Sequence, residues 1–568
     1  MPQGSIRSHL PALLLCMLAA MFLATLPHWL GLAHWHRPIW IADHDEMFYL
    51  AIVGQAYDNH PWRLTEPMLV NGLQNPYPWL QMIPGIVLAK AAGLGPLAVG
   101  LIWRAMGAAF ISAMYYLLTY RMTRIKALAV CLTVSICADV GVLYSMPVLR
   151  QIWLVVSFLS GHGQGFLATY PKIAPSWRIV TPTLSLGYLL LFIGLLGRAL
   201  EQFRWQRIIA AGLACGLLFY VYFYFVMAVG LGIFLNMLID AKRRWTYFFT
   251  GLIGLICGLP NVLSQSALSM STSSDWLHRW DMFVTIPRTS ELLIPKVAIL
   301  YSCLCLVWCL LRARQLLYLW VFAFSALLLL NHQVLTSLQI QNYHWLYTIG
   351  PVHAVLLVAL IWNEMVRRPS WKRPYLAAVY VMTPVIFLSG LWLRRIEATQ
   401  TQESQTILHD LEHYEQMRFS PEGKALPLVP NAFVAGQQDF VDFASVLENQ
   451  RPLLHYTVLS SPSIDDREWD ERAALSGYLQ ATPRADFAAE QRLDLEINLP
   501  RSADIRASRL AGRLAAFDQI SADPRPWLGR YPVRYVAVKP NGIPAEFAVK
   551  LSMQPLQRGP YWDLWRLP

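Results

Sequence analysis

Charged residues are scarce in this sequence. Asp, Glu, Lys and Arg make up 14% of its 568 residues, whereas a soluble globular protein carries about a quarter. The first apolar stretch, residues 11–30, has no charged side chain and is long enough to cross the hydrocarbon core of a bilayer. Further apolar stretches follow it, unlike a secretory signal ahead of a soluble body. The composition therefore indicates an integral membrane protein with an uncleaved first span.

The sequence also lacks the patterns of several common kinds of site. It contains neither a G-x-G-x-x-G pattern nor a Walker A pattern, so no glycine-rich nucleotide-binding loop is expected. All eight cysteines lie in apolar stretches before residue 395, which excludes a disulfide framework and a cysteine-based zinc site. We interpret these cysteines as small buried apolar residues.

Basic residues outnumber acidic ones only in the first part of the chain. Up to Arg395 there are 28 Lys and Arg against 12 Asp and Glu, and from Ile396 onward there are 18 against 23. The basic residues of the first part form short runs between apolar stretches, as in cytoplasmic loops that obey the positive-inside rule. A nucleic-acid-binding protein would gather its cations on one soluble face, so no nucleic-acid partner is predicted.

The basic runs determine the predicted topology. With the N-terminus and every basic run in the cytoplasm, the chain needs about eleven spans. They are predicted near residues 11–31, 100–120, 127–146, 180–197, 207–221, 224–240, 246–264, 296–311, 315–331, 347–363 and 375–393. An odd number of spans places the C-terminal part of the chain outside the cytoplasm.

Two domains are predicted. Residues 1–395 form a transmembrane domain whose long first outer loop, residues 32–99, contains an apolar piece at residues 78–95, predicted to be a helix at the membrane interface. The tail, residues 396–568, is polar, acidic and proline-rich, and it alternates helical stretches with short predicted strands. The strands are predicted near residues 432–436, 451–459, 531–539 and 561–567. The tail is therefore predicted to be an extracytoplasmic α/β domain.

The densest group of acids in the transmembrane part is Asp43, Asp45 and Glu46, at the start of the first outer loop. Asp43 or Asp45 can be the N-cap of the apolar, helix-like segment that follows. A carboxylate in partly dehydrated surroundings is also what a general base or a metal ligand requires. We favour the functional interpretation, because only 12 acids occur up to Arg395 and three of them fall here.

The plan of the chain resembles the GT-C superfamily of membrane glycosyltransferases. Asp45 and Glu46, followed by Tyr49, look like the Asp-Glu motif of protein mannosyltransferases and of lipid A aminoarabinose transferases. Asp43, two residues earlier, departs from the plain form of the motif. The aromatic segment Tyr222–Phe225, the interfacial helix and the extracytoplasmic tail fit the same plan. The resemblance implies transfer of a sugar from a polyprenyl phosphate to an acceptor outside the membrane, with Asp45 or Asp43 as the base and Glu46 beside them.

The resemblance also implies that cations stabilise the phosphate that leaves, so basic residues of the outer loops are candidates. They are Lys172, Arg178, Arg279 and Arg288. For each of them the alternative is a side chain that anchors the chain at the membrane interface. Arg178 is our preferred candidate, because it lies just before a predicted span. A lipid-linked donor also explains why no nucleotide-binding loop is needed.

The outer segment from Asn331 to Trp345 is rich in amides and imidazoles. The candidates for binding the sugar or the acceptor are His332, Gln333, Gln341, Asn342 and His344. The alternative is an interfacial belt with solvated polar residues. The spacing of the two histidines is not a recognised zinc pattern, and whether a divalent metal takes part is left open.

We therefore predict a polytopic α-helical membrane protein of the GT-C type, in a bacterial inner membrane with a periplasmic tail. It would act on a polyprenyl-phosphate-linked sugar and a glycan, lipid or protein acceptor. One alternative is a transporter or lipid-carrier flippase, for which Arg104 and Asp139 are the candidate intramembrane charges, although the sequence shows no repeated halves. The other alternative is a non-enzymatic envelope assembly protein that binds through its tail.

Overall fold

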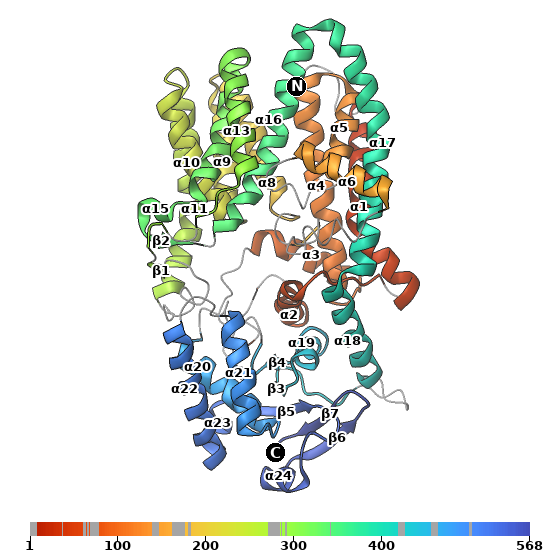
Figure 1. Cartoon of the computed structure of the whole chain (residues 1–568), viewed down its shortest axis with the longest axis vertical. Helices are drawn as coiled ribbons and strands as arrows, with labels where there is room; N and C mark the ends of the chain where they lie inside the picture. Colours follow the sequence, from red (N-terminus) through yellow and green to blue (C-terminus); the bar gives the residue numbers. More distant parts are fainter. Residues whose placement is uncertain are drawn as a thin grey trace.

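The structure is a computed structural model of the chain. It describes residues 8–36, 38–60, 64, 68, 79–138, 147–161, 177–179, 183–270, 284–285, 287–289, 292–340, 342–418, 426–455, 464–498 and 503–568. The described residues are mainly helical, with a small sheet near the C-terminus (Figure 1). Long helices run side by side through the upper part of the molecule, and most of the tail forms the lower part.

A helix lies at the position of each predicted span. These helices are α1 (Leu10–Trp35), α4 (Ala98–Thr123), α5 (Lys126–Cys137), α8 (Leu186–Glu201), α9 (Trp205–Leu218), α10 (Phe223–Ile239), α11 (Arg244–Met270), α13 (Lys296–Arg312), α14 (Leu317–Leu329), α16 (Leu346–Arg367) and α17 (Pro369–Gln400). Among the described residues, α1, α4, α11, α16 and α17 contain segments that are long and apolar enough to cross a membrane. The number of spans stays a prediction, because several of the other helices are shorter.

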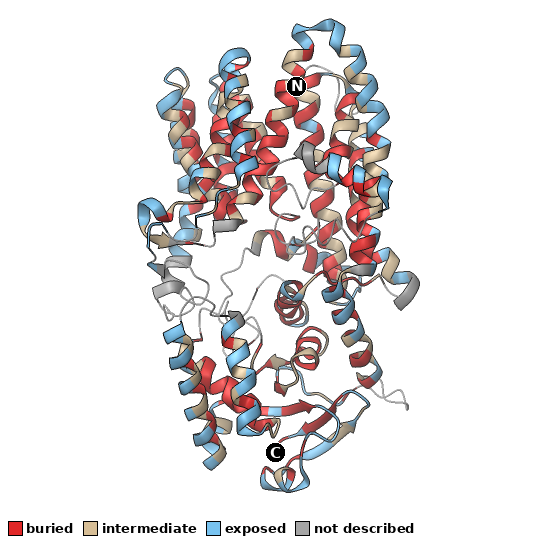
Figure 2. Ribbon diagram, viewed as in Figure 1, coloured by how far each residue is buried: buried red, intermediate tan, exposed pale blue. Residues whose placement is uncertain are grey.

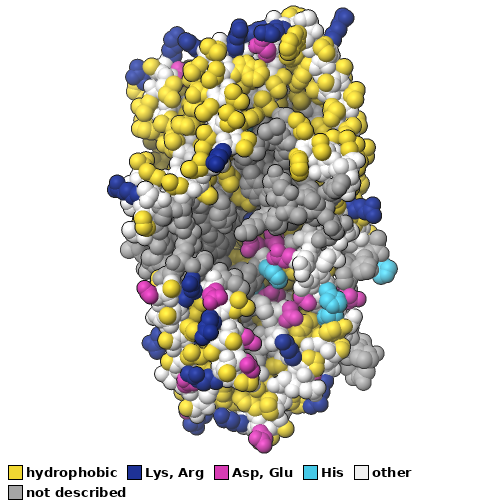
Figure 3. Space-filling view, viewed as in Figure 1, with side chains coloured by type: hydrophobic (Ala, Val, Ile, Leu, Met, Phe, Trp, Pro, Cys, Tyr) yellow, Lys and Arg dark blue, Asp and Glu magenta, His cyan; other side chains and the backbone are white. Residues whose placement is uncertain are grey.

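The outer surface of this bundle is apolar. Large side chains such as Leu18, Leu304 and Leu311 are 62%, 62% and 73% exposed. Figure 2 shows exposed residues on the outer faces of the helices and buried residues on their inner faces, and Figure 3 shows hydrophobic side chains over the upper half of the molecule. Such an extended apolar surface is stable in lipid rather than in water.

Basic residues gather at one end of the bundle. The turns from α4 to α5, α8 to α9, α10 to α11, α13 to α14, and α16 to α17 each contain at least one Lys or Arg. Lys and Arg side chains crowd the top of the molecule in Figure 3, near the turn from α16 to α17 in Figure 1. This arrangement of turns is the one that the positive-inside rule predicts for a cytoplasmic face.

Short helices lie at the other end of the bundle. They are α2 (His44–Asp58) and α3 (Trp79–Ala91), whereas α6 (Pro147–Ser160) packs against α17 higher in the bundle (Figure 1). Helix α3 forms within the piece for which an interfacial helix was predicted, and it lies across the lower part of α4 (Figure 1). The Trp103 indole of α4 donates to the Met82 carbonyl of α3 at 3.0 Å, which fixes the two helices together.

The tail contains a mixed five-stranded sheet in the order β4-β3-β5-β7-β6. Its strands are β3 (Phe433–Gly436), β4 (Arg451–Pro452), β5 (Val533–Val538), β6 (Gln554–Arg558) and β7 (Asp563–Arg566). Strand β3 runs parallel to β4 and β5, and β7 is antiparallel to β5 and β6. Gly436 has a φ of 120°, and an added Cβ would lie 1.8 Å from the Ala537 carbonyl oxygen of β5. Only glycine fits at this end of β3.

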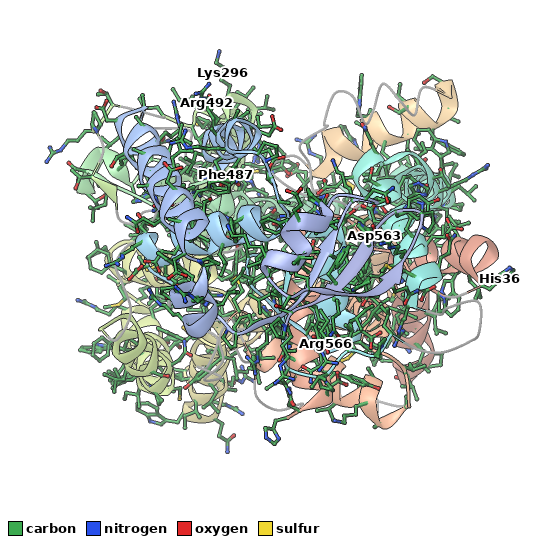
Figure 4. All side chains as sticks on the ribbon, turned by 90° about the horizontal axis from the view of Figure 1, so that it is seen from below. His36, Lys296, Phe487, Arg492, Asp563 and Arg566 are labelled. Carbon is green, nitrogen blue, oxygen red and sulfur yellow. The ribbon has the colours of Figure 1, made fainter. Side chains whose placement is uncertain are left out.

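Helices cover the sheet. They are α18 (Gln402–Arg418), α19 (Gln438–Leu447), α20 (Asp466–Leu479), α21 (Arg484–Asn498), α22 (Ala503–Ala522), α23 (Arg525–Arg530) and α24 (Ala545–Lys550). Seen from below, Figure 4 shows the sheet with Asp563 and Arg566 on β7, and the α21 residue Phe487 among the helices to its left. Phe487 is fully buried and stacks on Phe517 of α22 at a centroid distance of 4.5 Å. The tail thus has a hydrophobic core of its own.

Helix α2 packs against both parts of the molecule. Its residues that pack with the tail are Met47, Leu50 and Ala51, and those that pack with α3 and α4 are Phe48, Ile52, Val53 and Ala56. Backbone approaches closely at Gly54, where an added Cβ would lie 2.7 Å from the Val446 carbonyl oxygen of α19. The Gln55 amide donates to the Gln450 carbonyl at 3.1 Å. The start of the first outer loop is therefore held between the bundle and the tail.

Candidate functional site

The acid cluster forms the first turn of α2. Asp43 is the N-cap: its backbone is extended, and its Oδ1 accepts a hydrogen bond from the Glu46 backbone N–H at 2.9 Å. Asp45 and Glu46 follow in the first turn, where the helix dipole favours negative charge. The N-cap interpretation therefore holds for Asp43. It does not hold for Asp45, whose carboxylate points elsewhere.

Arg178 joins the two aspartates. Its guanidinium donates to Asp45 Oδ2, and its Nε lies 3.6 Å from Asp43 Oδ2. Arg178 and Asp43 are mostly buried, with 18% and 17% of their side chains exposed, whereas the Asp45 side chain is 55% exposed. Two predicted acids and the preferred predicted cation thus lie in direct contact, and Asp45 is the member that a substrate can reach.

Burial and the Arg178 charge act in opposite directions on the pKa values of the two aspartates. The pKa of Asp43 is raised above its ordinary value, chiefly by burial and also by Glu46 and Glu403, while Arg178 acts to lower it. The pKa of Asp45 is likewise raised by partial withdrawal from water against the lowering effect of Arg178. Removing the Arg178 charge would therefore raise both pKa values further.

Glu46 has different surroundings from the aspartates. Its carboxylate is 1% exposed and accepts two hydrogen bonds from Arg104 of α4, at 2.9 Å to Oε1 and 2.6 Å to Oε2. The Ala42 backbone N–H also donates to Oε2 at 2.9 Å. Arg104, which the transporter alternative needed as an intramembrane charge, is fully buried in this ion pair. Sequence reasoning noticed both residues, but nothing in the sequence indicated that they pair.

An aromatic cluster lies beside Arg178. His344, on the 3-10 helix η4 (Asn342–Trp345) that precedes α16, stacks on Tyr224 at 4.6 Å, and its Nδ1 is hydrogen-bonded to the Tyr222 hydroxyl. Burial, with the nearby Arg178 charge, lowers the pKa of His344 to about 3, so its imidazole is neutral at physiological pH. Tyr347 also interacts electrostatically with Arg178. The segment for which sugar binding was predicted thus approaches the acids.

The other predicted site residues are more dispersed. Arg288 is exposed, and its Nε donates to the Ser337 hydroxyl at 2.9 Å. The His332 ring is bonded to the Leu329 carbonyl at 2.8 Å, and Gln333 is buried in α15 (Gln333–Thr336). Asn342 begins η4. The remaining predictions, Lys172, Arg279 and Gln341, lie outside the described residues. The roles of all these residues stay predictions.

Further acids lie where α18 and α19 face the start of α2. Glu403 Oε1 accepts from the His44 backbone N–H at 2.9 Å. The pKa of Asp410 is raised to about 6, mainly by burial and also by Asp439. Figure 3 shows Asp, Glu and His side chains near the hollow between the apolar upper half and the lower part. Sequence reasoning missed these acids of α18 and α19, because their position near the site depends on how the tail packs against α2.

The described residues contain no group of three or more His, Cys, Asp and Glu side chains placed to hold a metal ion. The charged groups that meet at the described site are two carboxylates and a guanidinium. An exposed carboxylate can accept a proton, and a partly buried guanidinium can bind an anion such as phosphate.

The fold has a counterpart among solved structures, whereas no family model and no curated protein matches the sequence. A crystal structure of ArnT from Cupriavidus metallidurans bound to undecaprenyl phosphate aligns over 99% of this chain and 98% of its own, with a TM-score of 0.53 and 12% identity. The apo form of the same protein aligns over 93% and 94%, with a TM-score of 0.46 and 12% identity. The undecaprenyl phosphate-bound structure confirms the predicted resemblance at the level of the fold: this chain has the fold of that ArnT.

Proposed function

We propose that the protein is a membrane glycosyltransferase that moves a sugar from a polyprenyl phosphate to an acceptor hydroxyl at the outer face of the membrane. The observation that carries the proposal is the contact of Arg178 with Asp43 and Asp45 at the start of α2. The fold supports it, because the similar ArnT structure is one bound to undecaprenyl phosphate. The proposed donor is a lipid-linked sugar of that class.

Each charged group has a distinct proposed role. Asp45 accepts the proton of the acceptor hydroxyl while the hydroxyl oxygen attacks the anomeric carbon of the sugar. The bond between the anomeric carbon and the phosphate oxygen breaks, and the polyprenyl phosphate leaves with its new charge stabilised by Arg178. Asp43 holds the helix end and the other side of Arg178. The acceptor is a glycan, a lipid or a protein.

The ion pair between Arg178 and Asp45 couples donor binding to this chemistry. A donor phosphate competes with the Asp45 carboxylate for the same guanidinium. Once Arg178 turns toward the phosphate, Asp45 loses the cation that lowers its pKa. Asp45 then becomes a stronger base at the moment when the donor is in place.

Purified protein in lipid nanodiscs should transfer a labelled sugar from a polyprenyl-phosphate donor and release polyprenyl phosphate in equal amount. The same sugar on a nucleoside diphosphate is the matched control donor. It should give no product, because the sequence has no nucleotide-binding loop. Product formation can be followed by thin-layer chromatography with a panel of glycan, lipid and peptide acceptors. Transfer from the nucleotide donor alone would refute the proposed donor class.

The proposed orientation places the end with the basic turns in the cytoplasm and the tail outside. An alkaline phosphatase, which is active only outside the cytoplasm, should therefore be active when it is fused after Pro568. The same enzyme fused in the turn from α10 to α11, after Lys242, should be inactive. Activity in the second fusion and none in the first would reverse the orientation. It would also move the site to the cytoplasmic face.

A further inference from the structure

Arg104 is buried in α4, and each nitrogen of its guanidinium has a partner. Nε donates to the Trp177 carbonyl at 3.0 Å. Nη1 lies 2.9 Å from Glu46 Oε1 and 3.1 Å from His28 Nε2, and Nη2 lies 2.6 Å from Glu46 Oε2. The Trp40 ring covers the guanidinium at 4.4 Å. A buried guanidinium with this many directed bonds has a single allowed position.

The groups around Arg104 are fixed in turn. The other ring nitrogen of His28 lies 3.0 Å from the Pro38 carbonyl, and Glu46 also accepts from Ala42. Gly100, one turn before Arg104 on α4, lets the Glu46 carboxylate pack close to the helix backbone, because an added Cβ would lie 2.9 Å from Glu46 Oε1. The network therefore joins α1, the segment before α2, the first turn of α2, and α4.

Both sides of the proposed active site are attached to this one side chain. Glu46 belongs to the same helical turn as Asp45, and Trp177 is the residue directly before Arg178. Arg104 donates hydrogen bonds to the Glu46 carboxylate and to the Trp177 backbone carbonyl. Arg104 thus sets the separation between the two aspartates and Arg178 indirectly, through their sequence neighbours Glu46 and Trp177.

We propose that Arg104 is a positioning residue of the transfer reaction: through Glu46 and the Trp177 carbonyl it holds Asp43 and Asp45 at contact distance from Arg178. This proposal rests on the proposed function and deepens it. It assigns Glu46, which was predicted among the catalytic acids, to the positioning network. A purely structural role is the competing explanation, since a buried ion pair that loses one member is strongly destabilised.

Arg104→Lys separates the two explanations. Lysine keeps the positive charge beside Glu46 but has no planar fork, so it cannot hold both carboxylate oxygens and the Trp177 carbonyl together. With full-length protein in nanodiscs, we expect kcat to fall about 10–10²-fold, because a displacement near 1 Å has an effect of that size. The donor KM should change less. Arg104→Ala is unsuitable as the main test, because it leaves a bare buried carboxylate.

The pH profile supplies a readout that lost stability does not change. Asp43 faces Arg178, Glu46 and Glu403, and Asp45 faces Arg178, Asp43 and His44. If the acids move away from Arg178, they lose the charge that lowers their pKa before the donor binds. The acidic limb of the kcat/KM profile, which reports the free enzyme, then moves to higher pH. A variant whose only defect is a smaller folded fraction has lower rates at every pH, but its acidic limb lies at the wild-type pH.

Arg121→Lys is the matched control. Arg121 lies on the same helix, donates to the Gly194 carbonyl at 2.8 Å and pairs with Glu201 at 2.6 Å, far from the acids along the helix. It should keep the wild-type kcat and acidic limb. Arg104→Lys with wild-type kcat, or with a loss that matches its folded fraction and an unmoved limb, would overturn the proposal.

Amide hydrogen exchange distinguishes failure of this inference from failure of the proposed function. If the wild-type protein transfers no sugar from any lipid-linked donor, the proposed function fails. Exchange over residues 43–49 and 177–179 then still tests the network. Faster exchange in Arg104→Lys than in Arg121→Lys supports Arg104 as the residue that holds these two segments, and equal exchange overturns it.

Discussion

Replacing Asp45 with Asn is expected to lower kcat about 10²–10⁴-fold, the usual contribution of a positioned general base. Asparagine keeps the size of the side chain but cannot accept the proton of the acceptor hydroxyl. The fold should be unaffected, because Asp45 is half exposed and is not the N-cap of α2. The measurement is initial rate with a lipid-linked donor, using variant protein that accumulates in the membrane at the wild-type level.

Asp43→Asn is the matched control for Asp45→Asn. Asparagine caps a helix about as well as aspartate, so the start of α2 should be preserved. Asp43 lies farther from Arg178 than Asp45 does and is less exposed. We therefore expect the smaller loss from Asp43→Asn. A larger loss in this variant would transfer the role of base to Asp43, and full activity in both variants would refute the proposed mechanism.

Replacing Arg178 with Gln is expected to lower kcat about 10²–10³-fold, the effect of removing one group that stabilises charge in a transition state. The acidic limb of the kcat/KM profile, which reports the free enzyme in which Arg178 contacts Asp45, should also move to higher pH. The sign follows from the surroundings: Arg178 lowers the pKa of both aspartates, so its loss raises them, and the base becomes protonated at a higher pH than before. Rates measured between about pH 4.5 and 9, where ordinary acid–base catalysts titrate, give both the loss of kcat and the position of the acidic limb.

Arg288→Gln is the control for Arg178→Gln. Arg288 was predicted as a second phosphate partner, but it is exposed and bonded to Ser337. It should keep kcat within about twofold of the wild type, as expected for a surface substitution away from the reacting groups. Undecaprenyl phosphate should compete with the donor in this variant and much less in Arg178→Gln. Equal competition in the two variants would remove Arg178 from the phosphate site.

The positions of the helices could be predicted from the sequence because a long apolar run must be helical to cross a bilayer. The strands β3, β5 and β7 lie within predicted strands, since each contains buried apolar or aromatic residues. Of the strand predicted at residues 451–459, only Arg451 and Pro452 form β4, and residues 456–459 lie outside the described residues. Strand β6, Gln554–Arg558, was missed. It contains no β-branched residue and lies at the sheet edge, largely exposed, so its extended form depends on pairing with β7 rather than on its own residues.

The candidate site was predicted residue by residue but not as an arrangement. Asp45 and Arg178 were selected for their chemistry, and they are in contact across 133 positions of sequence. No periodicity relates two such positions, because the packing of α2 on α4 and of the segment before α8 decides it. Glu46 shows the limit most clearly. Its neighbours in sequence suggested catalysis, whereas its partner Arg104, 58 positions away, places it in the interior.

Helix α2 is shared between two hydrophobic cores, one with the tail and one with the bundle. A movement of the tail as a rigid body must therefore carry α2 with it or separate Met47, Leu50 and Ala51 from their neighbours. Because the acids occupy the first turn of this helix, a displacement of the tail that carries α2 with it also displaces the acids. An acceptor that pulls on the tail would change the geometry of proton transfer without touching a single reacting atom.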